Sequence, residues 1–333
     1  MRTFAHHVAV DPAEAVTLVA DDPSARFLAG GSNLVDHLKL GVVEPGLLVD
    51  ISRLALDGIE ETSEGGLRVG ATVRNSDLAA HPVVRRDFPV VAEALLAGAS
   101  PQIRHQATTG GNLLQRTRCV YFQDVTTPCN KREPGSGCAA LEGYARHNAV
   151  LGASAACVTT HPSDLAVALA AVDAQVVVLG PDGERRVPMT QLHRLPGDRP
   201  ADDTVLTHGE LITAVELPGD RSAPRSAYVK VRDRASYAFA LVSVAACLEV
   251  ADDTVAEVRI AWGGVAHRPW RATRAEAALR GTRVDELDED AVRAAADLEL
   301  EAAETDDRTA FKVPMVRNTT ALVLGRLIGE VAR

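Results

Sequence analysis

The feature that most constrains this chain is an irregular stretch between Ser100 and Ala156, which interrupts two regions of regular hydrophobic pattern. The stretch is rich in Gly, Pro, Arg, Thr and Cys and shows little helical or strand periodicity. So long a segment without regular elements is unusual inside a compact domain, and such segments more often serve a function than merely connect elements. We therefore expect the core to be built from the flanking regions, and the stretch itself to contribute to a site.

Alternating helices and strands are predicted before the irregular stretch. Asp11 and Pro12 form a helix start, because Asp is a favoured N-cap and Pro suits the first helical position. The apolar pattern then continues as short elements bounded by Gly, Pro and Asn. The expected helices lie at 13–20, 34–40, 75–81 and 89–98, and the expected strands at 25–29, 47–51 and, as a pair, within 58–72.

Regular pattern returns with HPSDLAVALAAVDAQVVVL, which predicts a capped helix beginning near Ser163, then a strand and a hairpin turn at 180–183. After the polar stretch GDRSAPRS, three strand-like runs precede three helical patterns. Strands followed by helices indicate an α+β domain rather than a doubly wound sheet. The runs lie at 227–232, 239–250 and 255–262, and the helices at 274–279, 289–304 and 316–331.

Length and charge limit the classes of protein to consider. A chain of 333 residues predicts about two or three domains. Its formal net charge of −10 argues against nucleic acid as the main partner. The most apolar window, 165–179, is too short for a membrane span, and the N-terminus lacks the pattern of a signal peptide. We expect a soluble chain that is cytoplasmic, or periplasmic by co-export with a signal-bearing partner.

The sequence contains two glycine pairs. The first, in LAGGSN (28–33), lies between a predicted strand and a predicted helix, and the second lies in ATTGGNLLQR (107–116). Adjacent glycines let backbone N–H groups approach one point, and a helix N-terminus behind them favours negative charge. Neither stretch has the Walker or the GxGxxG spacing. Two separate anion cradles suit a long ligand with two phosphates, although two purely structural turns remain an alternative.

Four of the five cysteines fall in or next to the irregular stretch, with the spacing C-x9-C-x8-C-x18-C. The fifth, Cys247, sits in the apolar run AACLEV and is interpreted as a core residue. The spacing alone leaves two disulfides, a zinc site, an iron–sulfur cluster and unligated thiols open, although zinc sites usually show closer cysteine pairs. Basic residues nearby would offset the charge of four thiolates: Arg116, Arg118, Lys131 and Arg132.

The chain resembles the FAD-binding subunit of molybdenum hydroxylases, the xanthine dehydrogenase and carbon monoxide dehydrogenase family. The resemblance rests on LAGGSNL, IRHQATTGGNLLQRTRCVYFQD, PCNKREPGSGCAA, HPSDLAVALAAVDA and WGGVAHRPWRA. Its cysteine segment is similar to the branch of bacterial periplasmic aldehyde oxidoreductases. The resemblance implies an α+β fold with a vanillyl-alcohol-oxidase-type (PCMH-like) FAD-binding domain at 1–217, made of two α/β subdomains at about 1–55 and 56–217. It further implies an iron–sulfur loop at 115–157 and a C-terminal flavoprotein domain at 225–333, with a three-stranded antiparallel sheet plus helices.

The same resemblance implies which residues bind cofactors. The implied FAD contacts are Leu28, Ala29, Gly30, Gly31, Ser32, Asn33 and Leu34, then Thr108, Thr109, Gly110, Gly111 and Asn112, then Ser163 and Asp164, and Lys230. The implied ligands of an extra [4Fe–4S] cluster are Cys119, Cys129, Cys138 and Cys157. Ser32 and Asn33 depart from the commoner GGT-D form of the first turn, and both can still bind phosphate oxygens. From the residues alone, Asp164 could instead cap a helix and Lys230 could be a solvated charge.

The implied function is electron transfer through cofactors, with no residue of this chain catalytic toward the organic substrate. An aldehyde or N-heterocycle would be oxidised on a molybdenum cofactor in a large molybdopterin-binding subunit. Electrons would pass through the [2Fe–2S] clusters of a small subunit to FAD in this chain, and then to an external electron acceptor. Two alternatives are a self-contained FAD reductase of the same fold and a zinc- or disulfide-stabilised binding module without redox activity.

Overall fold

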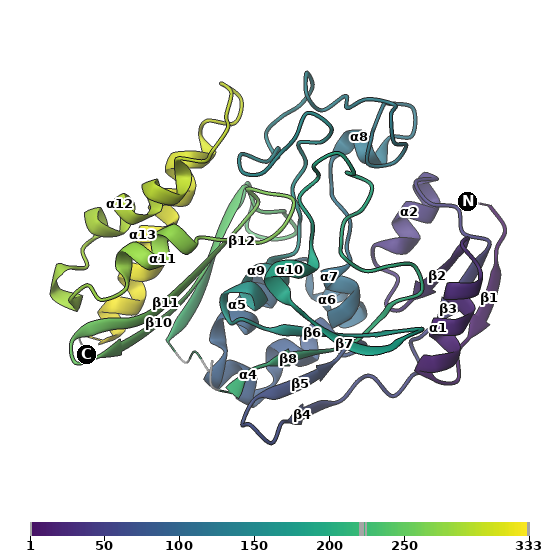
Figure 1. Ribbon diagram of the computed structural model, residues 1–333, viewed down its shortest axis with the longest axis horizontal. Coiled ribbons are helices and arrows are strands. Elements are labelled where there is room, and N and C mark those ends of the chain that lie inside the picture. The colour runs from purple at the N-terminus through teal and green to yellow at the C-terminus, as the bar shows by residue number, and fades with distance from the viewer. Residues whose placement is uncertain (1, 220–222, 224, 332–333) are drawn as a thin grey trace.

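The computed structural model describes residues 2–219, 223 and 225–331 (Figure 1). Within these residues the strands form three sheets, with the orders β1-β3-β2, β4-β5-β8-β6-β7 and β12-β11-β10-β9. The first sheet is parallel and the other two are antiparallel. The mixed α+β class predicted from the sequence is confirmed. Part of the predicted linker, at 220–222 and 224, lies outside the described residues, and the domain boundaries stay a prediction.

The parallel sheet positions the first glycine turn. It consists of β1 (Ala5–Val8), β2 (Ala25–Leu28) and β3 (Leu47–Asp50), with α1 (Pro12–Asp21) and α2 (Leu34–Leu40) as its helices. The Asp11 side chain accepts a hydrogen bond from Glu14 N, so the predicted N-cap is confirmed. The strand β1 was missed, because AHHV is short and mostly exposed. The glycine turn 30–33 therefore leaves the carboxyl end of β2 and enters α2.

The five-stranded sheet carries most of the core of the second region. Its strands are β4 (Ile59–Glu61), β5 (Leu67–Gly70), β6 (Gln175–Gly180), β7 (Gly183–Pro188) and β8 (Leu211–Leu217). Its helices are α3 (Asn75–Ala80), α4 (Pro82–Asp87), α5 (Pro89–Ala97), α9 (Asp164–Ala171) and α10 (Met189–Leu192). Every residue of α9 is buried, as expected of a helix that is apolar on all sides. The predicted hairpin between β6 and β7 is confirmed.

The irregular stretch contains three short helices, which the sequence pattern did not predict. They are α6 (Pro101–Gln106), α7 (Thr109–Leu113) and α8 (Val120–Gln123). Residues 124–163 contain neither a helix nor a strand, and they form the loops around α8 at the top of Figure 1. The second glycine turn lies inside α7 rather than in a loop.

The C-terminal region packs helices against an antiparallel sheet. The three predicted strands are β9 (Ser226–Val231), β10 (Val242–Ala251) and β11 (Thr254–Gly263). A fourth strand, β12 (Trp270–Arg271), extends the predicted three-stranded sheet and was missed because it has two residues. The helices are α11 (Thr273–Leu279), α12 (Glu289–Leu300) and α13 (Lys312–Val331), with a short 3-10 turn at Val284–Glu286.

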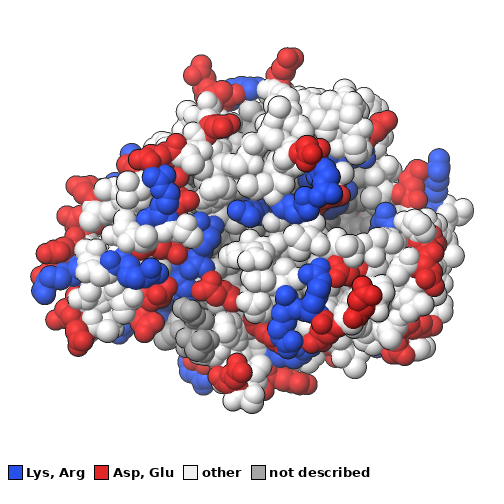
Figure 2. All heavy atoms as spheres, in the orientation of Figure 1, with Lys and Arg blue, Asp and Glu red and all other residues white. Residues whose placement is uncertain are grey.

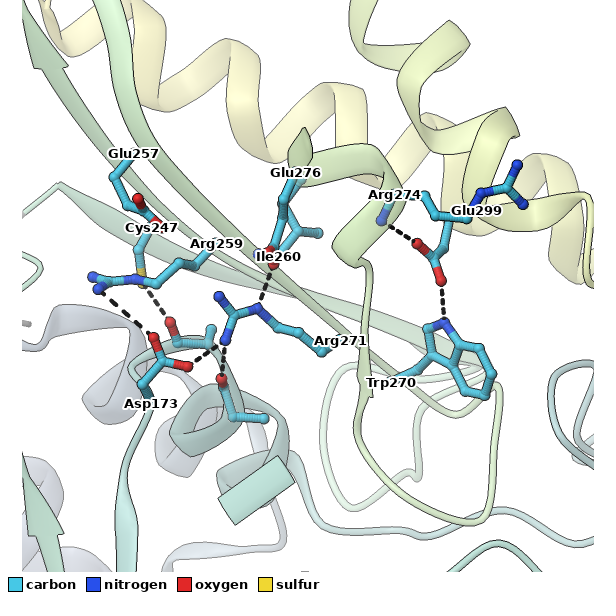
Figure 3. A network of polar contacts seen from close by, with 12 residues as sticks. Asp173, Cys247, Glu257, Arg259, Ile260, Trp270, Arg271, Arg274, Glu276 and Glu299 are labelled. Atoms are coloured by element: carbon cyan, nitrogen blue, oxygen red, sulfur yellow. Dashed lines mark hydrogen bonds and ion pairs between the residues drawn. The ribbon is translucent and has the colours of Figure 1, made fainter. Parts of the chain in front are cut away.

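A buried polar network joins α9 to this C-terminal sheet (Figure 3). Arg271 donates hydrogen bonds to Asp173 at 2.5 Å, to the carbonyl of Ala170 at 3.0 Å and to Glu276. Cys247 lies nearby at 2% exposure, with its thiol 3.6 Å from the carbonyl of Ala171, so its interpretation as a core residue is confirmed. The network fixes the C-terminal sheet against the helix that begins at the candidate site.

Candidate functional site

A cleft of about 840 Å³ lies between α2, the second glycine turn, the start of α9 and the end of β9. Ligand clefts in proteins commonly have volumes of about 300–1,000 Å³, so this cleft can hold a large cofactor. Of the predicted FAD contacts it is lined by Ser32, Asn33, Gly111, Asn112, Asp164 and Lys230. The structure thus brings together residues from four separate parts of the sequence.

The first glycine turn packs closely against Gln106, which lies just before the second glycine turn. A Cβ on Gly30 would lie 2.2 Å from the carbonyl oxygen of Gln106, closer than side chains tolerate. The Gln106 side chain also donates to the carbonyl of Gly30 at 2.9 Å. Gly31 has a φ of +71°, a conformation that favours glycine. Leu28, Ala29, Gly30, Gly31 and Leu34 therefore frame the turn, while Ser32 and Asn33 face the cleft.

The second glycine turn divides into a buried half and a cleft-facing half. Thr108 caps α7 by accepting a hydrogen bond from Gly111 N at 3.3 Å. Thr109 donates to the carbonyl of Val73 at 3.1 Å, and Gly110 N donates to the carbonyl of Ala71. Thr108, Thr109 and Gly110 therefore anchor the turn to the chain that follows β5. Gly111 and Asn112 present it to the cleft.

Side-chain amides connect the turns with the rest of the site. The Asn33 side chain accepts a hydrogen bond from Arg116 N at 2.9 Å. The Asn112 side chain accepts one from the hydroxyl of Ser163 at 2.6 Å, and that hydroxyl in turn accepts from Ala166 N. Ser163 is therefore the N-cap of α9, and it ties this helix to the second turn.

The far end of the cleft holds a buried ion pair. Asp164 and Lys230 lie 2.7 Å apart with side chains only 9% and 3% exposed. The Tyr228 hydroxyl donates to the second oxygen of Asp164 at 2.5 Å. Burial and the charge of Asp164 raise the pKa of Tyr228 well above its ordinary value, so this hydroxyl keeps its proton. Asp164 is also the acidic residue in the first turn of α9, whose N-cap is Ser163, and the Lys230 side chain is buried rather than solvated.

Several residues at this site were missed by the sequence analysis. Tyr228 lies two positions before Lys230 on β9, so strand alternation could have identified it as a neighbour on the same face. The Arg104 and Arg118 side chains also line the cleft, and Arg118 lies over the ring of Phe239 at 5.1 Å. No sequence signal singled out Arg104. Both guanidinium groups favour an anionic ligand.

The four cysteines of the irregular stretch line one cavity, although they come from distant sequence positions. Cys129 and Cys138 face each other in an isolated β-bridge. The Asn130 side chain holds the intervening turn by accepting hydrogen bonds from Gly135 N and Gly137 N. The loop therefore places Cys129 and Cys138 as a pair, and the remaining members of the set are Cys119 and Cys157.

Three observations bear on the four interpretations of the cysteines. All five cysteines of the chain are free thiols, so the structure contains no disulfide among them. In the described ranges, no group of three or more His, Cys, Asp or Glu side chains is arranged to hold a metal ion. Burial raises the pKa of the Cys157 thiol to about 11 and also raises that of Cys119.

The four thiols match in number the ligands of an iron–sulfur cluster and also those of a structural zinc site. The cavity that they line is small, at about 10 Å³.

The cysteine cavity and the cleft are neighbours. A further cavity of about 230 Å³ is lined by Cys119, Arg118 and Asp164. Cys119 also lines the cysteine cavity, and both Arg118 and Asp164 also line the cleft. The residues after the second glycine turn thus form the wall that separates the two candidate sites.

Comparison with known proteins assigns this chain to a class. The family described as FAD binding domain in molybdopterin dehydrogenase matches residues 2–220, and the CO dehydrogenase flavoprotein C-terminal domain matches residues 226–326. The chain belongs to the FAD-binding medium subunits of the molybdenum hydroxylase family, as its motifs predicted. The first match supports FAD as its cofactor.

Individual relatives cover nearly the whole chain. The aldehyde oxidoreductase FAD-binding subunit PaoB of Escherichia coli is 49% identical over 97% of this chain and 98% of its own length. The carbon monoxide dehydrogenase medium chain of Hydrogenophaga pseudoflava is 28% identical over 94% of each chain. A solved structure of carbon monoxide dehydrogenase from Hydrogenophaga pseudoflava matches with a TM-score of 0.75 at 27% identity, over 97% of this chain and 96% of that one. The fold is thus that of a medium subunit throughout.

Two further properties are the distribution of charged side chains on the surface and the length and polarity of the helices. On the face drawn in Figure 2, basic and acidic side chains are interspersed rather than gathered into one basic field. Among the described residues, no helix combines the length and the apolar character needed to cross a bilayer.

Proposed function

We propose that this chain is the electron-transfer FAD subunit of a molybdenum-dependent aldehyde oxidoreductase. The observation that carries the proposal is the 49% identity, over almost the full length, to an aldehyde oxidoreductase FAD-binding subunit. FAD, when bound, accepts electrons singly and releases them in pairs, which suits a junction between iron–sulfur clusters and an acceptor. The chain's own task is to bind the cofactor and to control its surroundings.

The cleft residues support specific roles in FAD binding. No backbone carbonyl within the described part of the chain accepts from the N–H groups of Gly31, Ser32 or Asn33, so these groups are available to phosphate oxygens. Gly111 and Asn112 line the same cleft and would provide the second contact to the pyrophosphate region. At the other end of the cleft, Asp164 and Lys230 would hold fixed charges beside the isoalloxazine ring.

We further propose a [4Fe–4S] cluster as a second cofactor of this chain, because four cysteines from distant positions line one cavity. Four thiols line it, and Lys131 lies among them as a buried cation. Cluster binding replaces thiol protons by iron, which removes the cost of ionising buried thiols. We assign Cys119, Cys129, Cys138 and Cys157 as the four ligands.

The proposal includes partners and a compartment. The partners are a large molybdopterin-binding subunit, a small subunit with two [2Fe–2S] clusters, and an electron acceptor outside the complex. The FAD-binding domain would occupy residues 1–217 and the C-terminal domain 225–333. The complex would be cytoplasmic, or periplasmic by co-export with a signal-bearing partner.

Anaerobic reduction by substrate tests the proposal. An aldehyde added to the co-purified complex should bleach the visible flavin band, while the same aldehyde added to this chain alone should leave it unchanged. Addition of an acceptor to the complex should restore the band. Bleaching of the isolated chain by its own substrate would overturn the proposal in favour of a self-contained FAD enzyme.

A further inference from the structure

Lys131 is a buried lysine that lies between Cys129 and Cys138 in the sequence. Its side chain is 3% exposed, and the residue lines the cysteine cavity. The ammonium group donates to the carbonyl of Pro200 at 2.7 Å and to the carboxylate of Asp203. Lysine is rarely buried without a partner, because loss of hydration disfavours its charge. The contacts to Pro200 and Asp203 provide the buried Lys131 side chain with hydrogen-bond partners.

Asp203 also forms an ion pair with a second cation, Arg116. Arg116 donates from Nε to the other carboxylate oxygen of Asp203 at 2.6 Å. Burial opposes ionisation of Asp203, but the two cations outweigh it and lower the pKa of this carboxyl below its ordinary value. The group formed by Lys131, Asp203 and Arg116 therefore contains two positive charges and one negative charge. Of the three residues, Lys131 is the one that lines the cysteine cavity, so its positive charge lies closest to the thiols.

The neighbouring basic residue has a different role. Arg132 donates to the carbonyls of Tyr121 and Phe122, both at 2.8 Å, and to the carbonyl of Thr127. All three acceptors belong to the cysteine loop itself. Arg132 thus folds the loop, whereas Lys131 connects the loop to the segment 200–203 outside it.

Segment 200–203, which binds the Lys131 ammonium group, is itself held in place by contacts with neighbouring residues. Arg194 N donates to the carbonyl of Asp203 at 3.0 Å, and His193 pairs with Thr204 in an isolated bridge. The His193 ring lies 2.8 Å from the carbonyl of Leu113, at the end of α7. The position of the Lys131 charge is therefore set by the same scaffold that carries the second glycine turn.

We propose that Lys131, held by Asp203, is a positioning residue that raises the reduction potential of the cluster bound by the four cysteines. The inference rests on the proposed function, because it requires that cluster. Reduction adds one electron to the cluster and makes it more negative, and no bond forms or breaks in the step. A fixed buried cation stabilises the more negative state, since buried charges interact through a low dielectric and are weakly screened by salt.

Charge-changing variants test the proposal in the purified complex. Lys131→Met should lower the midpoint potential of the cluster, and Lys131→Arg should keep it near the wild-type value. Asp203→Asn removes a negative charge from the same place and should shift the potential in the opposite direction. Arg199→Met is the matched control, because the Arg199 side chain is 60% exposed and its charge is screened by water.

The readout is a redox titration of the cluster followed by electron paramagnetic resonance. A tenfold change in the ratio of reduced to oxidised cluster corresponds to about 59 mV for one electron. Shifts of opposite sign in the Lys131 and Asp203 variants, with no shift in Arg199→Met, are the expected result. Equal potentials in all variants, or shifts of the same sign for Lys131→Met and Asp203→Asn, would overturn the assignment.

Iron analysis separates this inference from the proposed function. If the wild-type chain holds no iron, the cluster assignment itself fails. If the wild type holds iron and Lys131→Met loses it, the titration of Asp203→Asn still decides the sign of the effect. If iron is retained throughout and the potentials do not move, only the role of Lys131 is refuted.

Discussion

Gly30→Ala is expected to weaken FAD binding for a purely steric reason. The added Cβ would lie 2.2 Å from the carbonyl oxygen of Gln106, so the two glycine turns would have to separate by close to an ångström. The acceptor is a backbone atom in α6, and it cannot move away by a rotamer change. Overpacking of this kind costs about 1–3 kcal/mol.

The cost should appear mainly in binding. Without FAD the turns can spread apart and relieve the overlap, whereas binding requires both turns to contact one ligand. A penalty of about 1–3 kcal/mol corresponds to an affinity about 5- to 150-fold weaker. The assay is a titration of the apoprotein with FAD, followed by flavin fluorescence.

The matched control for this experiment is Gly325→Ala. Gly325 lies within α13, and no atom would come within 4 Å of its added Cβ. This variant should bind FAD as the wild type does. Wild-type affinity in Gly30→Ala would refute the claim that the two turns act together on one ligand.

Three further predictions concern the remaining parts of the site. Cys129→Ala and Cys138→Ala should each lose iron while retaining FAD, and full retention of iron in elemental analysis would refute the ligand assignment. Asp164→Asn and Lys230→Met should each lower the free energy of unfolding by about 3–5 kcal/mol, because each leaves a buried partner unpaired. The double variant should lose less than the sum in urea unfolding, and simple additivity would contradict the pairing.

Burial lowers the pKa of His193 from 6.5 to about 4. The unfolded chain therefore takes up a proton in this range while the folded chain does not. The unfolding free energy should fall as the pH drops from 6.5 toward about 4, by about 1.4 kcal/mol per pH unit for this residue. His193→Gln should flatten that slope, and an unchanged slope would count against it.

The sequence predicted those parts of the site that depend on local chemistry. The glycine turns were recognised because glycine pairs next to strands and helices allow close backbone approach, and the approach of Gly30 to Gln106 is of this kind. The cap at Ser163 was predicted because its hydroxyl precedes a long apolar run. The α+β order followed from the sequence of strands and helices.

Other parts depend on contacts between distant residues and could not be predicted. The strand β8 inserts between β5 and β6, although it follows both in the sequence. The pairing of Lys131 with Asp203 joins positions 72 residues apart. A lysine or an aspartate in a sequence does not indicate which residue it will pair with. The strand formed by Trp270 and Arg271 has only two residues, so it is too short to show the alternating hydrophobic pattern of a strand.

The central claim is that one chain holds a flavin next to an iron–sulfur cluster. The most direct test is the content of FAD, iron and zinc in the purified chain, together with its visible spectrum. We predict about one FAD and about four irons per chain, with flavin bands on a broad iron–sulfur absorption. A colourless chain that contains zinc and no iron would contradict the account.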